Sequence, residues 1–246
     1  MFPFSPIRAV ALDLFHTVVD PEDFRPKDFV RTREIAKLLG LPLAEFERFW
    51  EEVTLARMTS ERPSVVDRVR DYCSSIGVRP APTSWSMVFD IAGRYTDLAI
   101  RNPRASVLDA LRGLRAKGLA LGLVSNCDER EMKAWASSIL APLFDATVFS
   151  CEVGAAKPSV EAYSALVPRW GRIPLSEAIF VGDGANNELV GARRAGFLHV
   201  VFDSEFVSAN GLRSTEANDR IRRDADAEVT TLGAVESLIA AWRKSQ

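Results

Sequence analysis

Short apolar runs recur along most of the chain, and each is followed by polar residues. Such runs occupy residues 7–12, 119–124, 146–150, 178–181 and 199–202. Their length and apolar content predict strands that are buried on both faces. Between these runs, apolar residues recur at helical spacing over residues 104–117, 129–140, 159–170 and 187–195. This alternation predicts an α/β fold with a Rossmann-like parallel sheet that helices cover on both faces.

Residues 21–100 depart from this alternation. They contain no strand-like run, and apolar residues recur there at helical spacing over residues 29–39, 43–58, 64–76 and 84–100. We therefore expect a helical insertion just after the first strand. On this interpretation residues 1–20 and 101–246 form the α/β core, and residues 21–100 form a separate helical domain.

Two segments near the carboxyl end differ in their pattern. Residues 207–228 are polar and show little periodicity, which predicts a surface loop. Residues 231–242 resume a helical pattern, and we expect that helix to pack on the edge of the sheet.

The composition is that of an ordinary soluble globular protein, because 47% of the 246 residues are hydrophobic and 26% are charged. The net charge is -2, from 31 basic and 33 acidic residues, so no overall field favours nucleic acid or an anionic membrane as a partner. No apolar stretch approaches the ~18 residues that a membrane-spanning helix needs. The amino-terminal residues also lack the pattern of a signal peptide.

Three cysteines, Cys73, Cys127 and Cys151, are widely spaced and lack a paired CxxC arrangement. This spacing predicts neither a zinc site nor a disulfide framework. Reduced thiols fit a cytoplasmic protein best, and we expect that localisation. The sequence gives no indication of the oligomeric state.

Polar side chains follow the predicted strands at the points where these strands end. Asp13 follows the first strand, Ser125 and Asn126 follow the second, and Asp183 follows the strand A-I-F-V-G. Lys157 lies in the segment G-A-A-K-P, directly before a predicted helix. Because such junctions share one edge of a parallel sheet, we expect these groups to converge on a single pocket.

The chemistry of these side chains is coherent. Two neighbouring carboxylates, Asp13 and Asp183, repel each other unless a cation lies between them, and oxygen ligands suit magnesium. Lys157 and the hydroxyl of Ser125, together with backbone amides, would hold an anion. A carboxylate that faces such an anion can act as a nucleophile. The residues therefore predict a site for Mg²⁺-dependent phosphoryl transfer.

The chain resembles the haloacid dehalogenase-like hydrolase superfamily over essentially its whole length. Four motifs carry the resemblance in the family's order: D-L-F-H-T from Asp13, V-S-N ending at Asn126, the lysine of A-A-K-P, and V-G-D-G-A-N-N-E-L-V-G-A from Val181. The helical insertion is similar to the cap domain that closes over the pocket in some members. The resemblance thus implies a hydrolase, and a closing cap favours a small phosphorylated metabolite as its substrate.

The resemblance also implies a role for each residue of the motifs. Asp13 would be the nucleophile, and it would hold Mg²⁺ together with Asp183 and the backbone carbonyl of Phe15. Glu188, five residues beyond Asp183, would act through water in the outer shell of the metal.

The substrate anion would be bound by the remaining motif residues. Ser125 and the amide of Asn126 would bind the oxygens of the transferring group, and Lys157 would neutralise charge on nucleophile and substrate. Thr17 would orient the loop of the first motif beside the substrate.

Phe15 departs from the pattern of the family's phosphatases, which carry a second Asp at this position as general acid and base. Such help is worth roughly 10²- to 10⁴-fold in rate. An aromatic residue there resembles instead the 2-haloacid dehalogenases, which need no metal. The fourth motif, with Asp183 and Glu188, resembles the phosphatases. A phosphatase is therefore the favoured hypothesis, with a dehalogenase and a catalytically weak binding protein as alternatives.

His16 stands where most relatives have Gly. It could supply the proton that Phe15 cannot, or it could be a loop histidine that points away from the site or contacts the cap. Trp50, Arg57 and Trp85 of the insertion could line the substrate pocket, and packing within the cap explains them equally well.

Overall fold

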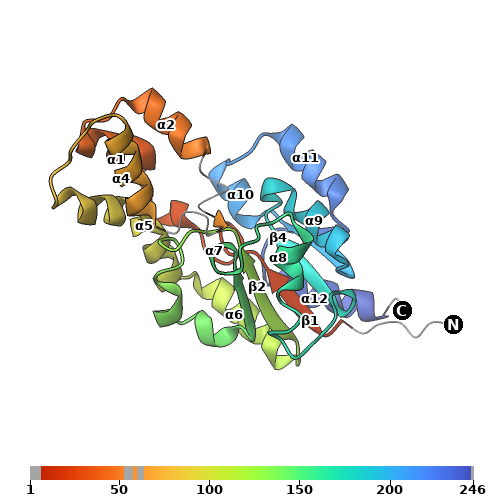
Figure 1. Ribbon diagram of the computed structural model, residues 1–246. Coiled ribbons are helices and arrows are strands. Elements are labelled where there is room, and N and C mark those ends of the chain that lie inside the picture. The colour runs from red at the N-terminus through yellow and green to blue at the C-terminus, as the bar shows by residue number, and fades with distance from the viewer. Residues whose placement is uncertain (1–6, 53–57, 60–63, 245–246) are drawn as a thin grey trace.

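The chain folds around a six-stranded parallel sheet in the computed structural model, which describes residues 7–52, 58–59 and 64–244 (Figure 1). The strands of this described part are, in chain order, β1 (Ala9–Leu12), β2 (Ala120–Ser125), β3 (Ala146–Phe149), β4 (Ala178–Gly182), β5 (His199–Asp203) and β6 (Ala227–Val229). Their spatial order is β3-β2-β1-β4-β5-β6. The chain thus winds outward from β1 in one direction and then in the other, as doubly wound α/β folds do. The predicted α/β class is confirmed.

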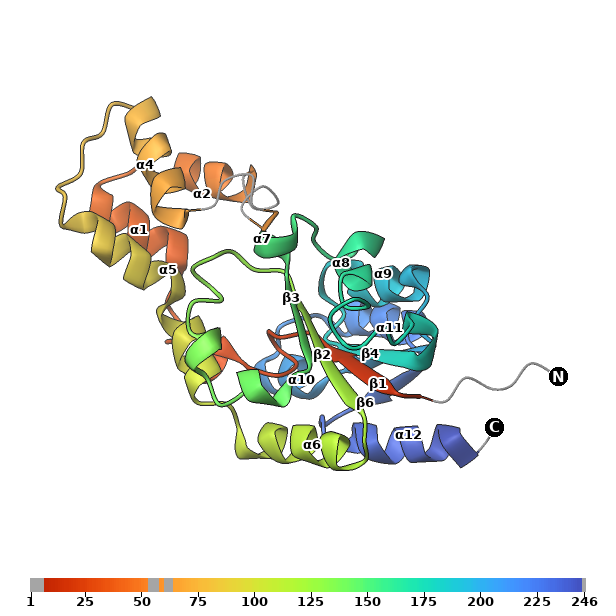
Figure 2. The ribbon, with the colours of Figure 1, turned by 60° about the horizontal axis from the view of Figure 1, so that its bottom comes forward.

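The central strands are buried on both faces, and alternate residues enter two separate cores. Val10 and Leu12 of β1 pack on the face covered by α6 (Ala105–Ala116) and α12 (Ala234–Lys244). Ala9 and Ala11 pack on the opposite face, under α8 (Val160–Ser164) and α9 (Glu188–Ala195). Figure 2 shows α6 and α12 side by side beneath the sheet. The continuous apolar runs of the sequence follow directly from this burial on two sides.

A lobe of four helices, α1 (Arg31–Leu39), α2 (Leu43–Glu52), α4 (Val65–Ser75) and α5 (Ser84–Arg101), projects from the sheet (Figure 1). We call it the helical lobe. It has its own core, which includes Phe46, Val69 and Val88. The carboxyl end of α5 enters the core of the sheet instead, through Ala99 and Ile100.

The predicted helices of the lobe are confirmed where the structure describes them. Ser64 caps α4, because its Oγ accepts the amide of Asp67 at 3.2 Å. Residues 53–57 of the predicted helix 43–58, which include Val53 and Arg57, lie outside the described residues. Within the described residues, no helix is both long and apolar enough to span a membrane.

The predicted helix over residues 129–140 is wrong. This segment forms turns, with one 3₁₀ turn η2 (Trp135–Ser137) and a second, η3 (Ala141–Leu143), after it. Asp128 Oδ1 accepts the amides of Arg130 and Glu131, both at 3.0 Å, so these amides bond a side chain at the start of the segment. Bonds of this kind cap the start of a helix, so they do not explain why no helix follows here.

Residues 128–131 instead connect the sheet to the helical lobe. Asp128 accepts a hydrogen bond from Arg68 of α4 at 3.1 Å, and Glu131 accepts one from Arg31 of α1, also at 3.1 Å. Arg130 donates to both carboxylate oxygens of Asp97 on α5, at 2.9 and 2.8 Å. We call residues 128–131 the charged connector.

The predicted helix over residues 159–170 is only partly present. The α-helix α8 ends at Ser164, and turns continue to Trp170. Pro168 lacks an amide hydrogen, and its ring would clash with the carbonyl four residues earlier, which is that of Ser164. The helix therefore ends where the proline requires it.

The predicted surface loop over residues 207–228 is also wrong. It contains most of α10 (Glu205–Asn210), all of α11 (Thr215–Asp224) and the start of β6. The Oγ of Ser214 caps α11 by accepting the amide of Ala217 at 3.3 Å. Ile221 is the one residue of α11 that is buried, and Ala217 is the only other apolar residue of this helix, so few apolar positions mark it in the sequence. The helix after it, α12, packs on a face of the sheet beside α6 and not on the edge.

Short elements complete the described part. They are the 3₁₀ turns η1 (Pro21–Asp23), η4 (Leu175–Glu177) and η5 (Ala185–Asn187), and the helical turn α7 (Ser150–Val153). The turn η5 links β4 to α9, so it lies at the carboxyl edge of the sheet.

Candidate active site

Asp13 and Asp183 extend from the carboxyl ends of two neighbouring strands, β1 and β4, at the point where the winding direction of the sheet reverses. The amide of Asp13 continues the pairing by donating to the carbonyl of Val181 at 3.0 Å. Both side chains are nearly buried, with 6% and 1% of each residue exposed. In open α/β sheets this reversal creates the crevice where ligands bind.

Lys157 joins two of the carboxylates at this edge. Its ammonium contacts the carboxylate of Asp13 and lies 2.6 Å from Glu188 Oε2. The other oxygen of Glu188 accepts the amide of Gly184 at 2.8 Å. Asp13, Asp183 and Glu188 each present an oxygen, and these three oxygens lie within 4.8 Å of one another. Hard oxygen donors in a compact, buried cluster are suited to Mg²⁺, so the donor set fits that ion.

Glu188 lies close to the other two carboxylates, because its oxygen is within 4.8 Å of those of Asp13 and Asp183. Gly182 makes this approach possible. A Cβ atom at residue 182 would lie 2.3 Å from Glu188 Oε1, so a side chain there would displace the carboxylate.

Burial dominates the electrostatics of the cluster. It raises the pKa of Asp13 and raises that of Glu188 well above its usual value, while the charge of Lys157 opposes both changes. Burial alone would lower the pKa of Lys157, but the carboxylates of Asp13 and Glu188 outweigh it and raise that pKa. The ammonium thus stays charged, and a cation among the carboxylates would favour their ionised forms.

Arg213 is part of this cluster, and sequence reasoning missed it. Its guanidinium donates to the backbone carbonyl of Asp183 and, at 2.6 Å, to Asp183 Oδ2. It comes from residues 207–228, which the sequence predicts as a structureless loop. The sequence held no signal for it, because only the packing of α11 on α9 brings this segment to the site.

Asn126 holds the loop of Lys157 in place. Its side-chain Nδ2 donates to the carbonyl of Lys157 at 2.8 Å, and its Oδ1 accepts the amide of Lys157 at 2.7 Å. The side chain of Asn126 therefore positions Lys157, which is a contact that the motif alone does not indicate.

Two buried hydroxyls at the site have no hydrogen-bond partner within the described residues. They are Ser125 Oγ, at the end of β2, and Thr17 Oγ1, in the loop after β1. Buried polar atoms are nearly always bonded, so each is available to a group that is bound from solution.

The loop after Asp13 turns sharply back on itself. The amide of His16 donates to the carbonyl of Val19 at 2.7 Å, and His16 has a φ of +61°. Glycine adopts this left-handed conformation most readily, and histidine is among the other residues found in it. His16 Nδ1 lies 3.1 Å from Asp20 Oδ1, and both oxygens of the buried Asp20 have partners, since Asn210 donates to Oδ2. His16 is thus held in one orientation.

A cavity of about 170 Å³ opens onto this cluster. Its lining includes Asp13, Lys157, Asp183 and Glu188, together with Phe15 and His16. The structure therefore brings most of the predicted site residues to one cavity. Trp50 and Trp85, in contrast, pack on the core of the helical lobe.

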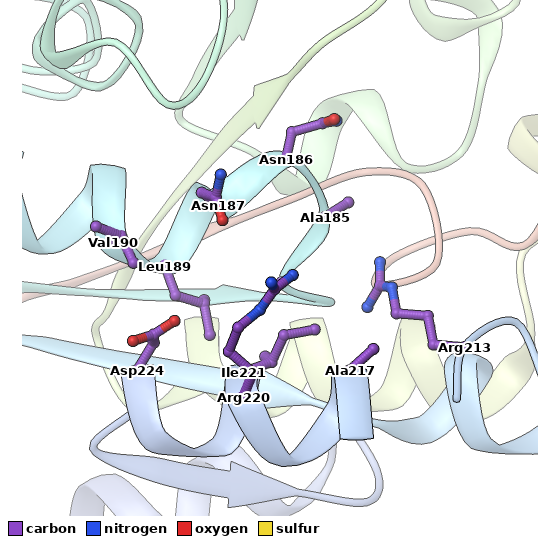
Figure 3. A pocket seen from close by; sticks show the side chains of 11 residues that line it. Ala185, Asn186, Asn187, Leu189, Val190, Arg213, Ala217, Arg220, Ile221 and Asp224 are labelled. Carbon is purple, nitrogen blue, oxygen red and sulfur yellow. The ribbon is translucent and has the colours of Figure 1, made fainter. Parts of the chain in front are cut away.

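A neighbouring cavity of about 220 Å³ lies behind η5, between α9 and α11 (Figure 3). Arg213 and Arg220 extend into it from the side of α11, and Asn186 and Asn187 line it from η5. Asn186 also lines the cavity at Asp13. The two cavities are thus separated by the loop that carries Asp183.

Comparison with known proteins agrees with this arrangement. Over 223 residues the chain is 26% identical to the glyceraldehyde 3-phosphate phosphatase of Methanothermobacter thermautotrophicus, covering 87% of this chain and 96% of that protein. The crystal structure of a HAD phosphatase from Thermococcus onnurineus superposes with a TM-score of 0.62 at 22% identity, over 94% of this chain and 97% of the other. A 2-haloacid dehalogenase from Pseudomonas syringae gives a TM-score of 0.61 at 20% identity, over 96% and 99%.

The two structural matches establish the fold, and they include both chemistries that the sequence left open. The model of the haloacid dehalogenase-like hydrolase family matches residues 7–196, which include all of the four motifs. This chain is a hydrolase that belongs to the haloacid dehalogenase-like family.

Proposed function

We propose that this hydrolase is a Mg²⁺-dependent phosphatase that acts on a small phosphorylated metabolite through a phosphoryl group carried on Asp13. The observation that carries the proposal is the buried cluster of Asp13, Asp183 and Glu188 around Lys157, beside a cavity. The similarity to a protein named glyceraldehyde 3-phosphate phosphatase supports the same chemistry.

The carboxylates of Asp13, Asp183 and Glu188 and the backbone carbonyl of Phe15 would hold the magnesium ion. When bound, the ion would neutralise charge on the phosphoryl oxygens and on the attacking carboxylate. This charge compensation explains why three buried carboxylates can share one site.

The residues of the chain supply the steps of the reaction. A carboxylate oxygen of Asp13 attacks phosphorus, the bond to the ester oxygen breaks, and that oxygen leaves with a proton. Lys157 and the unpartnered hydroxyls of Ser125 and Thr17 bind phosphoryl oxygens. Water then attacks the phosphoryl group on Asp13 and releases inorganic phosphate, which regenerates the carboxylate.

The helical lobe would serve as a cap, so that residues 21–100 form the cap domain and residues 1–20 and 101–246 form the hydrolase core. The separate hydrophobic core of the helical lobe supports this division. A cap over the cavity would exclude bulk water and strengthen the interactions with the phosphoryl group.

The dehalogenase alternative draws support from Phe15. This residue lines the cavity and stands at the position where phosphatases carry an acid. Dehalogenation needs no metal, and the carboxylate of Asp183 then has no function at the site. The buried acidic cluster therefore favours the phosphatase.

Hydrolysis of p-nitrophenyl phosphate tests the proposal. We expect turnover that requires Mg²⁺, stops with excess chelator, and is absent from Asp13→Asn. Release of halide from 2-chloropropionate without a metal would instead establish the dehalogenase. If the chain shows neither activity but binds Mg²⁺, it would be a binding protein.

A further inference from the structure

A third cavity, like the one at Asp13 about 170 Å³ in volume, lies between the helical lobe and the sheet. It adjoins the cavity at Asp13, because Phe15 and His16 line both. Its other walls come from the segment between β1 and α1 and from α5. They include the apolar and aromatic side chains of Phe29, Ile91 and Tyr95.

Two guanidinium groups and one carboxylate line this cavity: Arg25, Arg31 and Glu131. Arg31 Nη1 donates to Glu131 Oε1 at 3.1 Å. Arg25 Nε donates to Glu22, which does not line the cavity, at 3.0 Å. Each of the two guanidinium groups therefore has one carboxylate partner, Glu22 for Arg25 and Glu131 for Arg31, and these four groups together carry no net charge.

Arg25 and Arg31 are close enough to affect each other. Burial, followed by the like charge of Arg31, lowers the pKa of the Arg25 guanidinium from its usual value. Their side chains are 32% and 22% exposed. Two partly desolvated cations that repel each other are both stabilised by an anion placed between them.

The position of the cavity fits the organic part of a phosphate ester. With the phosphoryl group at Asp13, the carbon chain would pass Phe15 and His16 and enter between the apolar walls. Its far end would reach the two arginines. The small volume limits this chain to a few carbon atoms.

We propose that the substrate is a short phosphate ester that also carries a carboxylate, and that Arg25 and Arg31 bind this carboxylate. Because both guanidinium groups already have carboxylate partners, a ligand carboxylate with a single charge fits between them better than a second phosphate, which carries more negative charge. The inference rests on the proposed phosphatase function and specifies its substrate class.

Two esters that differ at one carbon test the inference. 3-Phosphoglycerate and glyceraldehyde 3-phosphate have the same chain and the same phosphate position, but the first ends in a carboxylate and the second in an aldehyde. We expect kcat/KM to favour the acid at least tenfold. We expect this ratio to fall at least tenfold in Arg25→Gln and in Arg31→Gln.

The ratio cancels any difference in the fraction of folded enzyme. Arg94→Gln is the matched control, because Arg94 also lies on the lobe, pairs with Asp90 and lines neither of these two cavities. Its ratio should equal that of the unchanged chain. A ratio that stays the same in both Arg25→Gln and Arg31→Gln would overturn the assignment.

Failure of the inference can be separated from failure of the proposed function. Equal or faster turnover of the aldehyde overturns the inference and leaves the phosphatase intact. If no ester is hydrolysed, the phosphatase proposal fails, and calorimetric binding of the two compounds still tests the preference. Binding of the acid that is no tighter than binding of the aldehyde would then overturn it.

Discussion

His16 Nδ1 lies 3.1 Å from Asp20 Oδ1, so a buried carboxylate orients the imidazole beside the cavity at Asp13. This contact leaves Nε2 of His16 as the ring nitrogen without an assigned partner. Because His16 stands next to Phe15, at whose position phosphatases carry their acid, we propose that it delivers a proton to the leaving oxygen.

We expect His16→Asn to slow the hydrolysis of alkyl phosphates, whose leaving groups need a proton, by roughly 10²-fold or more. Hydrolysis of p-nitrophenyl phosphate should fall much less, because its leaving group is stable as an anion. Asn tolerates the positive φ of residue 16, so the loop should keep its shape. An equal loss on both kinds of ester would show that His16 has only a structural role. Phe15→Asp in the same background should restore the lost rate.

Arg213 would compete with a metal for Asp183, because it holds Oδ2 of that carboxylate at 2.6 Å. Arg213→Gln frees the oxygen and makes the site more negative by one charge. We expect Mg²⁺ to bind about tenfold more tightly, measured by calorimetry.

The matched control for this variant is Arg220→Gln. Arg220 lines the same cavity behind η5 (Figure 3), and among the described residues no hydrogen bond or ion pair joins it to Asp183. Its Mg²⁺ affinity should not change. Weaker Mg²⁺ binding in Arg213→Gln would contradict the prediction and show that Arg213 positions Asp183 for the metal.

Asp203, at the end of β5, should make stability depend on pH. Burial raises its pKa from 3.8 to about 7, and its Oδ2 has no partner within the described residues. The folded state therefore binds one more proton than the unfolded state between about pH 4 and about pH 7. Stability must fall as the pH rises through that window, by up to roughly 4 kcal/mol at about 1.4 kcal/mol per pKa unit.

Urea unfolding at pH 5 and at pH 8 measures this effect. The chain should be less stable at pH 8, and Asp203→Asn should remove a large part of the difference, because the amide does not titrate. A difference of the same size in the variant would exclude Asp203 as its source.

Gly182→Ala should disrupt the acidic cluster without altering any charge. The added methyl group would lie 2.3 Å from Glu188 Oε1 and force the carboxylate away from Lys157 and the amide of Gly184. We expect a stability loss of about 1–3 kcal/mol and a large loss of Mg²⁺-dependent turnover. Gly233→Ala is the control, since its nearest contact would lie at 4.0 Å. Unchanged turnover in Gly182→Ala would show that the position of Glu188 is not critical.

The sequence predicts the sheet and the convergence of Asp13, Lys157 and Asp183 because buried strands have continuous apolar runs and their polar ends share one edge. The apolar pattern does not reveal α11, because Ala217 and Ile221 are its only apolar residues. The sequence likewise gives no sign that Arg213 reaches the site. These are long-range contacts that only the packed fold creates.

Contacts made by the loops cannot be predicted from the sequence either. The pairing of Asn126 with the backbone of Lys157 joins residues 31 positions apart. The predicted helix at 129–140 is absent although Asp128 bonds the local backbone as a helix cap does, and Arg130 bonds the lobe. Apolar spacing and the cap both favour a helix there, and the sequence pattern gives no sign of the turns that form.

The charged connector has a mechanical consequence. It follows Ser125 by only three residues, and three of its side chains bind helices α1, α4 and α5. If the lobe moves as the proposed cap, its rotation would pull directly on the chain beside Ser125, so substrate entry and reshaping of that loop would be coupled. Because these ion pairs are largely buried, salt screens them little, and we expect the coupling to persist at high ionic strength.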